Sequence, residues 1–217
     1  MTLQDELNAY KSAPAHPNFR PEFGPILGRT ISGLIASGQA ERALKVGDKA
    51  PSFELPDQEG SVVSSADLLK QGPIVVSFYR GVWCPFCNIE LKALQAALGD
   101  IQARGATLVA ISQQTQANNR KSRRENDLHF RVLSDKGGEV GAAFGLRWVI
   151  PEEMREVHRQ LGGPIPAFNG EESWTLPMPG RYVIGRDRVI AYSEVNPDYT
   201  KRPEPSDLFP VLDHLRG

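Results

Sequence analysis

Two cysteines separated by two residues are the side chains of this chain best suited to do chemistry. Cys84 and Cys87, with Pro85 and Phe86 between them, are the only cysteines among 217 residues. Residues three apart lie about one turn apart on a helix, so the two sulfurs are close enough to form a disulfide. A thiolate, the ionised form of a cysteine, attacks disulfides and peroxides. The pair therefore predicts thiol–disulfide redox chemistry.

Two other roles for the pair have to be weighed against redox chemistry. A zinc site needs three or four ligands, but there is no second C-x-x-C, and the four histidines are scattered along the chain. A purely structural pair is the second alternative, because free cysteines are often simply buried small residues. The sequence favours the redox role, since a C-x-x-C that follows a strand and opens a helix is typical of thioredoxin-like proteins. We expect no metal and no cofactor.

The elements next to the cysteines determine how the sulfurs are presented. Residues 73–79 form a continuous apolar, β-branched run, as expected for a strand buried on both faces. A turn at Gly81 follows, and a helix is predicted to start at or just after Cys84, with Pro85 at its first position. Free N–H groups and the helix dipole at that end stabilise a thiolate. This arrangement is suited to a reactive cysteine.

Strands and helices alternate along the rest of the chain, which predicts an α/β domain with a central sheet flanked by helices. We assign residues 46–217 to this domain and residues 1–45 to an N-terminal helical extension. The strands are predicted at 52–55, 60–63, 73–79, 107–111, 129–133, 181–184 and 189–193, and the last two form a hairpin. The helices are predicted at 90–101, 115–127, 138–144, 151–161 and 206–215, with Ser206 as N-cap of the last and a Pro/Gly-rich connection at 162–179.

The extension shows helical spacing in its second half only. Leu27, Ile31, Leu34 and Ile35 recur at helical intervals up to Gly38. Four prolines, at positions 14, 17, 21 and 25, predict a broken and partly extended lead-in before this helix. We expect the extension to pack on the main domain or on the second subunit of a homodimer.

Composition and charge narrow the classes of partner and compartment. A net charge of −1 and a pI near 6.4 give no indication of a nucleic-acid or membrane partner. The basic run at residues 120–124 is followed by acidic residues, which is typical of a solvated helix face. No secretory signal and no apolar run of membrane-spanning length is visible. We therefore expect a cytoplasmic protein, and in the cytoplasm a close cysteine pair is more often catalytic than a structural disulfide.

Several segments, taken in order, resemble the alkyl hydroperoxide reductase/thiol-specific antioxidant (peroxiredoxin-like) branch of the thioredoxin superfamily. They are VGDKAPSFELPDQEGSVVSSADLL, PIVVSFYRGVWCPFCNIELKALQ, ATLVAISQQ, FRVLSDKGGEVGAAFGL, LPMPGRYVIGRDRVI and DYTKRPEP, and they cover about three-quarters of the chain. The resemblance implies a thioredoxin-like fold and a thiol-dependent antioxidant activity. These segments in this order identify the family more specifically than any one of the motifs would alone.

The active-site motif departs from that of peroxiredoxins proper, which read P-x-x-x-T-x-x-C. On that pattern Arg80 replaces the proline, Cys84 replaces the threonine, and Cys87 is the peroxide-attacking cysteine. On the thioredoxin pattern, Cys84 attacks and Cys87 resolves. The motif belongs to a subgroup that combines a peroxiredoxin-like chain with a thioredoxin-like site. Because Cys84 lies at the helix cap, which we expect to face solvent, and Cys87 one turn further in, we predict Cys84 as the nucleophile.

The resemblance also suggests roles outside the cysteine pair. It places Pro179 where thioredoxin-like proteins carry a cis-proline facing the C-x-x-C, although an ordinary trans proline at a strand start is the alternative. Arg181 or Arg80 would help to hold a peroxide and lower a thiolate pKa, although each is more often a surface arginine. Trp83 would shield the disulfide and contact partners, or simply pack.

Three residues of DYTKRPEP match the tail pattern of the subgroup, for which we expect a local salt bridge or a subunit contact. They are Tyr199, Arg202 and Glu204.

The sequence as a whole favours a thiol-dependent peroxidase that cycles between a Cys84–Cys87 dithiol and disulfide. A thioredoxin- or glutathione-type donor would restore the dithiol. The main alternative is a protein disulfide oxidoreductase without a peroxide step, which the departure from P-x-x-x-T-x-x-C favours. A redox-sensing binding protein is a third, because a fold does not fix a function.

Overall fold

The computed structural model describes residues 2–13 and 19–216. Its centre is a five-stranded sheet in the order β5-β4-β3-β8-β9. Strands β3, β4 and β5 run parallel, whereas β8 is antiparallel to both β3 and β9. The sheet is therefore mixed, as a thioredoxin-like fold requires. The strands are β3 (Ile74–Phe78), β4 (Thr107–Ser112), β5 (Arg131–Ser134), β8 (Gly180–Ile184) and β9 (Ile190–Val195).

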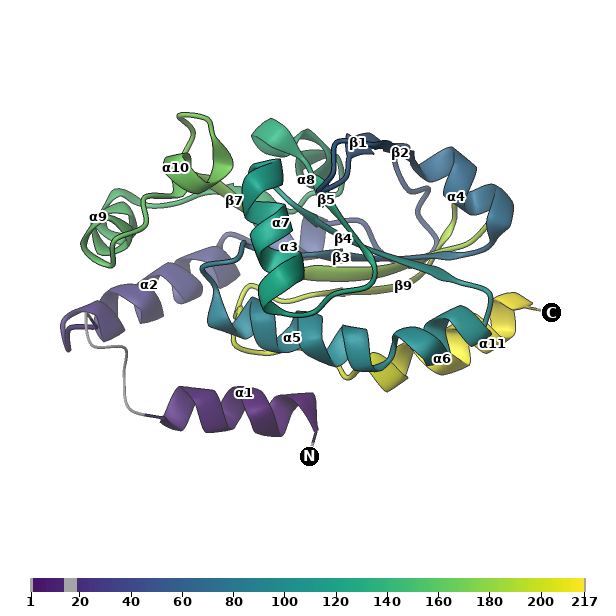
Figure 1. Cartoon of the computed structure of the whole chain (residues 1–217). Helices are drawn as coiled ribbons and strands as arrows, with labels where there is room; N and C mark the ends of the chain where they lie inside the picture. Colours follow the sequence, from purple (N-terminus) through teal and green to yellow (C-terminus); the bar gives the residue numbers. More distant parts are fainter. Residues whose placement is uncertain (1, 14–18, 217) are drawn as a thin grey trace.

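Helices and a hairpin cover the two faces of this sheet (Figure 1). On one face lie α5 (Pro85–Ala96), α6 (Leu98–Ala103) and α11 (Phe209–Arg216). The other face is covered by α4 (Ser65–Gln71), α8 (Glu139–Ala143) and the hairpin of β1 (Glu54–Pro56) and β2 (Val62–Ser64). Successive residues of β3 alternate between these two cores, with Val75 in the α5 core and Val76 in the other. This explains the continuous apolar run predicted as a doubly buried strand.

Several elements differ from the sequence prediction. The connection at 162–179 contains α10 (Ile165–Asn169) and β7 (Thr175–Pro177), and β7 pairs with β6 (Arg147–Val149), which was not predicted either. The helix predicted at 90–101 is two helices, α5 and α6, and begins earlier, at Pro85. Ser206 is not an N-cap, because it lies inside a 3-10 turn, Pro205–Leu208, that precedes α11. The remaining helical elements are α7 (Gln116–Glu125), the 3-10 turn Lys136–Gly138 and α9 (Glu152–Gln160).

The N-terminal extension contains more helix than its prolines suggested. Besides α2 (Phe23–Ala36), which ends before a left-handed Gly38, it has α1 (Leu3–Ser12) and a short α3 (Gln39–Arg42). The side chains of Thr2 and Asp5 form a reciprocal capping box that starts α1. The expected lead-in is therefore partly wrong, and the prolines at 14 and 17 lie outside the described residues. Helix α1 packs on α5, and α2 packs on α9.

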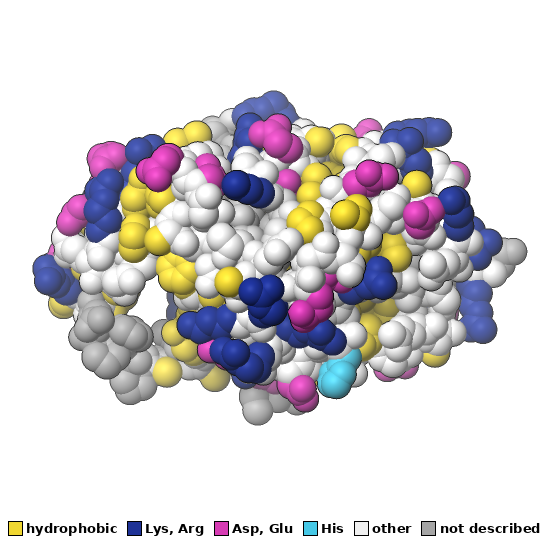
Figure 2. All heavy atoms as spheres, turned by 45° about the horizontal axis from the view of Figure 1, so that its top comes forward, with side chains coloured by type: hydrophobic (Ala, Val, Ile, Leu, Met, Phe, Trp, Pro, Cys, Tyr) yellow, Lys and Arg dark blue, Asp and Glu magenta, His cyan; other side chains and the backbone are white. Residues whose placement is uncertain are grey.

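The face of the molecule drawn in Figure 2 carries charges of both signs. Figure 2 shows lysine and arginine side chains interspersed with aspartate and glutamate. The basic run at 120–124 lies on α7, where Lys121 pairs with Glu125 and Arg123 pairs with Glu59. Among the described residues, no helix combines the length and the apolar character needed to cross a bilayer.

Candidate active site around Cys84 and Cys87

The two cysteines lie where β3 leads into α5. The chain turns at Gly81, where φ is 148°, and a Cβ there would come within 2.5 Å of the indole nitrogen of Trp83. Cys84 is the N-cap of α5 and Pro85 occupies its first turn, as the sequence predicts. Both thiols are free in this structure. The first turn of α5 therefore presents the sulfurs with its unpaired N–H groups nearby.

Both sulfurs are shielded from solvent. Cys84 is 1% exposed and Cys87 is 0% exposed. The expectation that Cys84 faces solvent is therefore wrong. The side chain of Arg80 lies against Cys84, and the rings of Trp83 and Tyr199 pack on Arg80. A reactant has to enter a closed site to reach either thiol.

Arg80 provides a positive charge beside Cys84. Its Nη1 lies 3.8 Å from the Cys84 sulfur. The guanidinium carbon is 4.0 Å from the ring centre of Tyr199 and 4.8 Å from that of Trp83, so the cation is stacked between two aromatic residues. The side chain of Arg80 is buried, and its Nε has no hydrogen-bond partner in the described part of the chain. Of the two arginines that the sequence singled out, this is the one that touches a sulfur.

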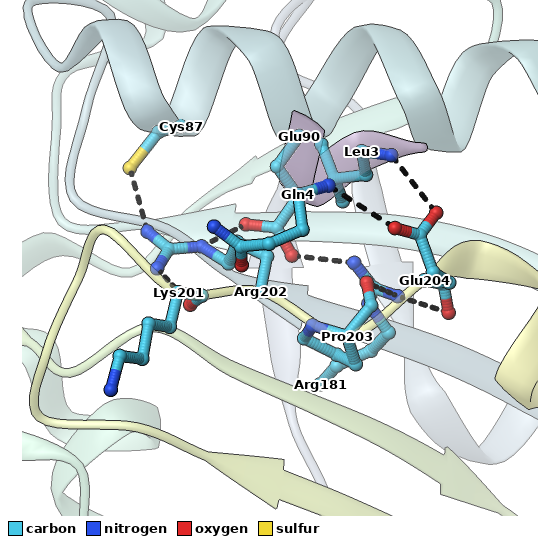
Figure 3. A network of polar contacts seen from close by, with 9 residues as sticks. All are labelled: Leu3, Gln4, Cys87, Glu90, Arg181, Lys201, Arg202, Pro203 and Glu204. Atoms are coloured by element: carbon cyan, nitrogen blue, oxygen red, sulfur yellow. Dashed lines mark hydrogen bonds and ion pairs between the residues drawn. The ribbon is translucent and has the colours of Figure 1, made fainter. Parts of the chain in front are cut away.

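A second arginine, which the sequence analysis did not link to the cysteines, lies beside Cys87. Arg202 places Nη2 at 3.7 Å from the Cys87 sulfur and donates from Nε to Glu90 at 2.6 Å (Figure 3). Arg181 donates to the other oxygen of Glu90 at 2.7 Å and to the backbone carbonyls of Pro203 and Glu204. Arg181 therefore does not contact a sulfur, but helps to hold the carboxylate that orients Arg202.

The hydrogen bond between the two thiols separates their pKa values, and the charges of Arg80 and Arg202 lower both. Burial raises the pKa of Cys84, but hydrogen bonding from Cys87 and the charges of Arg80 and Arg202 outweigh it and lower the pKa to about 6. Burial raises the pKa of Cys87, and hydrogen bonding to Cys84 together with the charge on Cys84 raises it further. One thiolate shared between two sulfurs therefore resides on Cys84. This direction agrees with the predicted role of Cys84, although its cause is not solvent exposure.

The loop before the motif is fixed by amide side chains from three elements. Gln114 Oε1 accepts from the backbone N–H of Val82 at 2.9 Å, and Asn88 Nδ2 donates to the carbonyl of Val82 at 2.8 Å. Asn126 in turn donates to Asn88 Oδ1 at 3.1 Å. The other end of Gln114 donates to the hydroxyl of buried Tyr79 at 2.7 Å. None of these residues was predicted from the sequence. Only Gln114 had a signal there, because Gln113 and Gln114 are polar residues directly after a buried strand.

Replacing Gln114 by Leu is expected to raise the pKa of Cys84. The backbone N–H of Val82 loses its partner, so the loop that places Arg80 against Cys84 is no longer held, and stability falls by about 1–3 kcal/mol. A titration of the ultraviolet absorbance of the thiolate measures the pKa. Gln113→Leu is the matched control, because Gln113 is equally buried but donates to Thr175 and not to the motif. An unshifted pKa in Gln114→Leu would contradict this role.

Pro179 differs from its expected cis setting, whereas Trp83 packs among side chains, which is one of its two predicted roles. No peptide bond in the described residues is cis, so the prediction of a cis Met178–Pro179 bond is wrong. Pro179 lies directly before β8, as the trans proline at a strand start that was the alternative, and the backbone N–H of Met178 donates to the carbonyl of Leu146 at 2.9 Å. Pro179 precedes Gly180, which pairs with Phe78 at the end of β3. Trp83 packs edge-to-face on buried His158 at 5.0 Å.

Among residues 2–13 and 19–216, no group of three or more His, Cys, Asp or Glu is placed to hold a metal ion. Burial and the charge of Arg80 lower the pKa of His158 to about 3, so its imidazole is neutral at ordinary pH. His16 lies outside the described residues.

Comparisons with known proteins point to one family. Residues 46–193 match the model of the AhpC/TSA family. The chain is 28% identical over 164 residues to a chloroplastic peroxiredoxin Q of Oryza sativa subsp. japonica, covering 76% of this chain but only 61% of that relative. It is also 27% identical over 160 residues to the thiol-disulfide oxidoreductase ResA of Bacillus cereus, covering 68% of this chain and 90% of ResA.

The similarity extends to a solved structure. The fold superimposes on the peroxidoxin BcpB of Mycobacterium tuberculosis with a TM-score of 0.61 and 25% identity, covering 80% of this chain and 97% of that one.

Proposed function

Because the chain belongs to the AhpC/TSA family, we propose that it is a thiol-dependent peroxidase that works through Cys84 and Cys87. The observation that carries the proposal is the sulfur of Cys84 at the N-terminus of α5, 3.8 Å from the guanidinium of Arg80 and one helical turn from a second thiol. The lowered pKa of Cys84 supports it. We assign this chemistry to a domain of residues 46–217. The relatives named peroxiredoxin and peroxidoxin support the assignment.

The chemistry proceeds in two steps within the chain. The Cys84 thiolate attacks one oxygen of the peroxide, the O–O bond breaks, and a sulfenic acid forms on Cys84. The departing oxygen takes up a proton and leaves as water or an alcohol. Cys87 then attacks the sulfur of the sulfenic acid, so that an S–S bond forms, the S–O bond breaks and water leaves. Arg80 is placed to donate hydrogen bonds to the peroxide oxygens, because its guanidinium adjoins the Cys84 sulfur.

The cycle closes outside the chain. An external dithiol of the thioredoxin type, or glutathione, reduces the disulfide by thiol exchange. Such donors are maintained in reducing compartments, and the cytoplasm is the compartment that we propose.

A protein disulfide oxidoreductase is the second candidate function. A C-x-x-C at a helix N-terminus favours it, and so does the similarity to ResA. The burial of both sulfurs favours the peroxidase, since a small peroxide enters a closed site more easily than a protein disulfide does.

NADPH consumption through thioredoxin and its reductase tests the proposal, with either a peroxide or a protein disulfide as the final oxidant. Turnover with peroxide supports the peroxidase. Turnover only with the protein disulfide would establish the second candidate, and turnover with neither would favour a redox-sensing binding protein.

The reactivity of the reduced protein is expected to rise with pH through about pH 6 and then level off, because the thiolate of Cys84 is the reacting form. The pKa of Cys84 is lower in the folded chain than in the unfolded chain. Its ionisation therefore stabilises the fold above the unfolded pKa, and this contribution is lost as the pH falls through about 6. The rate of alkylation by iodoacetamide between pH 4 and pH 10 measures the midpoint. A midpoint at the ordinary thiol pKa would contradict the assigned electrostatics.

A further inference from the structure

Helix α1 lies alongside α5, next to the cysteine motif and at the periphery of the molecule (Figure 1). Leu3 and Leu7 are its buried residues. The ring of Tyr10 meets the ring of Phe86 edge-to-face, with centres 5.3 Å apart, and Phe86 is one of the two residues between the cysteines. Burial raises the pKa of Tyr10, and the charge on Cys84 raises it further. Helix α1 therefore covers the outer side of the motif.

The first turn of α1 is anchored to the segment that also binds Cys87. The backbone N–H groups of Leu3 and Gln4 donate to the carboxylate of Glu204 at 3.0 and 3.1 Å (Figure 3). Two residues before Glu204, Arg202 contacts the sulfur of Cys87. Tyr199, slightly earlier, packs on Phe86 with ring centres 5.6 Å apart. This segment and α1 are thus two layers, each of which contacts Phe86 of the motif directly.

A protein dithiol cannot reach the cysteines through these layers. Thiol–disulfide exchange requires the attacking sulfur to come into bonding contact with one sulfur of the disulfide. Both cysteine side chains are at most 1% exposed. Strand β3 lies in the middle of the sheet, and α5 packs on that sheet through Leu91 and Leu94, so displacing either whole element would open the core. Helix α1 contributes only two buried side chains, and Tyr10 remains 43% exposed.

We propose that the surface beneath α1, formed by Phe86 and Tyr199, is the docking surface of a protein dithiol donor, and that α1 is a cover which the donor displaces. This inference rests on the proposed function, since it concerns the donor of that cycle. With α1 displaced, a donor thiolate attacks Cys84 of the disulfide, the S–S bond breaks and the sulfur of Cys87 leaves as a thiolate. The second donor thiol then attacks the mixed disulfide. The donor is oxidised to a disulfide, and Cys84 and Cys87 regain two electrons and two protons.

The two halves of the cycle then depend differently on α1. A peroxide is small, and a cavity of about 10 Å³ adjoins the Arg80 side of the site, lined by Arg80, Tyr199 and residues of α2 and by no residue of α1. We therefore expect oxidation to be independent of α1. Reduction by a protein follows the fraction of molecules in which α1 is displaced, so loosening α1 raises that rate by the same factor.

Leu7→Ala and Glu204→Gln both loosen α1, the first by removing a buried anchor and the second by removing the charge that accepts from its first turn. The exposed neighbours Lys11→Ala and Glu6→Gln are the matched controls on the same helix. Hydrogen exchange of the amides of α1 in the oxidised protein shows whether the helix is loosened. Stopped-flow mixing of the oxidised protein with reduced thioredoxin measures the reductive step, and mixing of reduced Leu7→Ala with hydrogen peroxide measures the oxidative step.

We expect reduction by thioredoxin to accelerate by about fivefold in Glu204→Gln and by tenfold or more in Leu7→Ala. These factors correspond to the stability that is typically lost with a helix cap and with a buried leucine, respectively. The controls should match the parent protein, and the peroxide step should be unchanged in Leu7→Ala. Faster exchange of the α1 amides without faster reduction would contradict the proposal that α1 is a cover displaced by the donor. So would equal acceleration of the oxidative and reductive steps. A parent protein that does not react with peroxide at all would instead remove the proposed function.

Discussion

Cys84→Ser is expected to abolish the reaction with peroxide, whereas Cys87→Ser is expected to keep the fast first step and to lose turnover. The reason is electrostatic, because the pKa of Cys84 is lowered to about 6 while that of Cys87 is raised. Without Cys87 the sulfenic acid on Cys84 has no resolving thiol in the chain, since these are the only two cysteines. Single-turnover kinetics with hydrogen peroxide, followed by trapping of the sulfenic acid, distinguish the two variants.

The opposite pattern would reassign both roles. Arg202 lies as close to Cys87 as Arg80 lies to Cys84, at 3.7 and 3.8 Å. If Cys84→Ser kept the fast step and Cys87→Ser lost it, the peroxiredoxin alignment would be the better guide. Arg202 would then be the cation that activates the attacking thiolate.

Replacing Glu90 by Gln is expected to produce the largest loss of stability, about 3–5 kcal/mol. Glu90 is buried and pairs with two buried arginines, so its removal leaves Arg181 and Arg202 without a compensating charge. The midpoint and slope of urea unfolding measure the change. Glu153→Gln is the matched control, because Glu153 also pairs with an arginine, Arg29, at 2.8 Å, but both side chains are exposed and solvent screens the pair.

A comparable small loss in the two variants would mean that the buried network contributes no more than a surface ion pair. In that case Arg202 would not be rigidly held against Cys87.

The sequence was most informative where one local rule decided the outcome. A continuous β-branched run predicted β3, and Pro85 one residue after Cys84 marked the start of α5. Alternating strands and helices indicated the central sheet and its flanking helices. The family resemblance then restricted the chemistry to thiols. Each of these features depends on residues close together in the chain.

The rest of the site depends on contacts across long stretches of sequence. Glu90 meets Arg202 112 residues further on, and Gln114 reaches Val82 32 residues before it. Cys84 was expected to face solvent because the position of a residue on its own helix does not reveal what the rest of the chain places over it. Helix α1 was missed because four nearby prolines outweighed a capping box that is visible only as Thr2 and Asp5. Such contacts require the tertiary fold.

The most direct test of the peroxidase is to mix the fully reduced protein with one equivalent of hydrogen peroxide. The rate of reaction and the intact mass of the product are then compared with the result for an equivalent small disulfide. We predict a faster reaction with peroxide, one intramolecular Cys84–Cys87 disulfide and a loss of two hydrogens per chain. A slow reaction with peroxide alongside a fast one with the disulfide would contradict the peroxidase, as would a product that is mainly a covalent dimer.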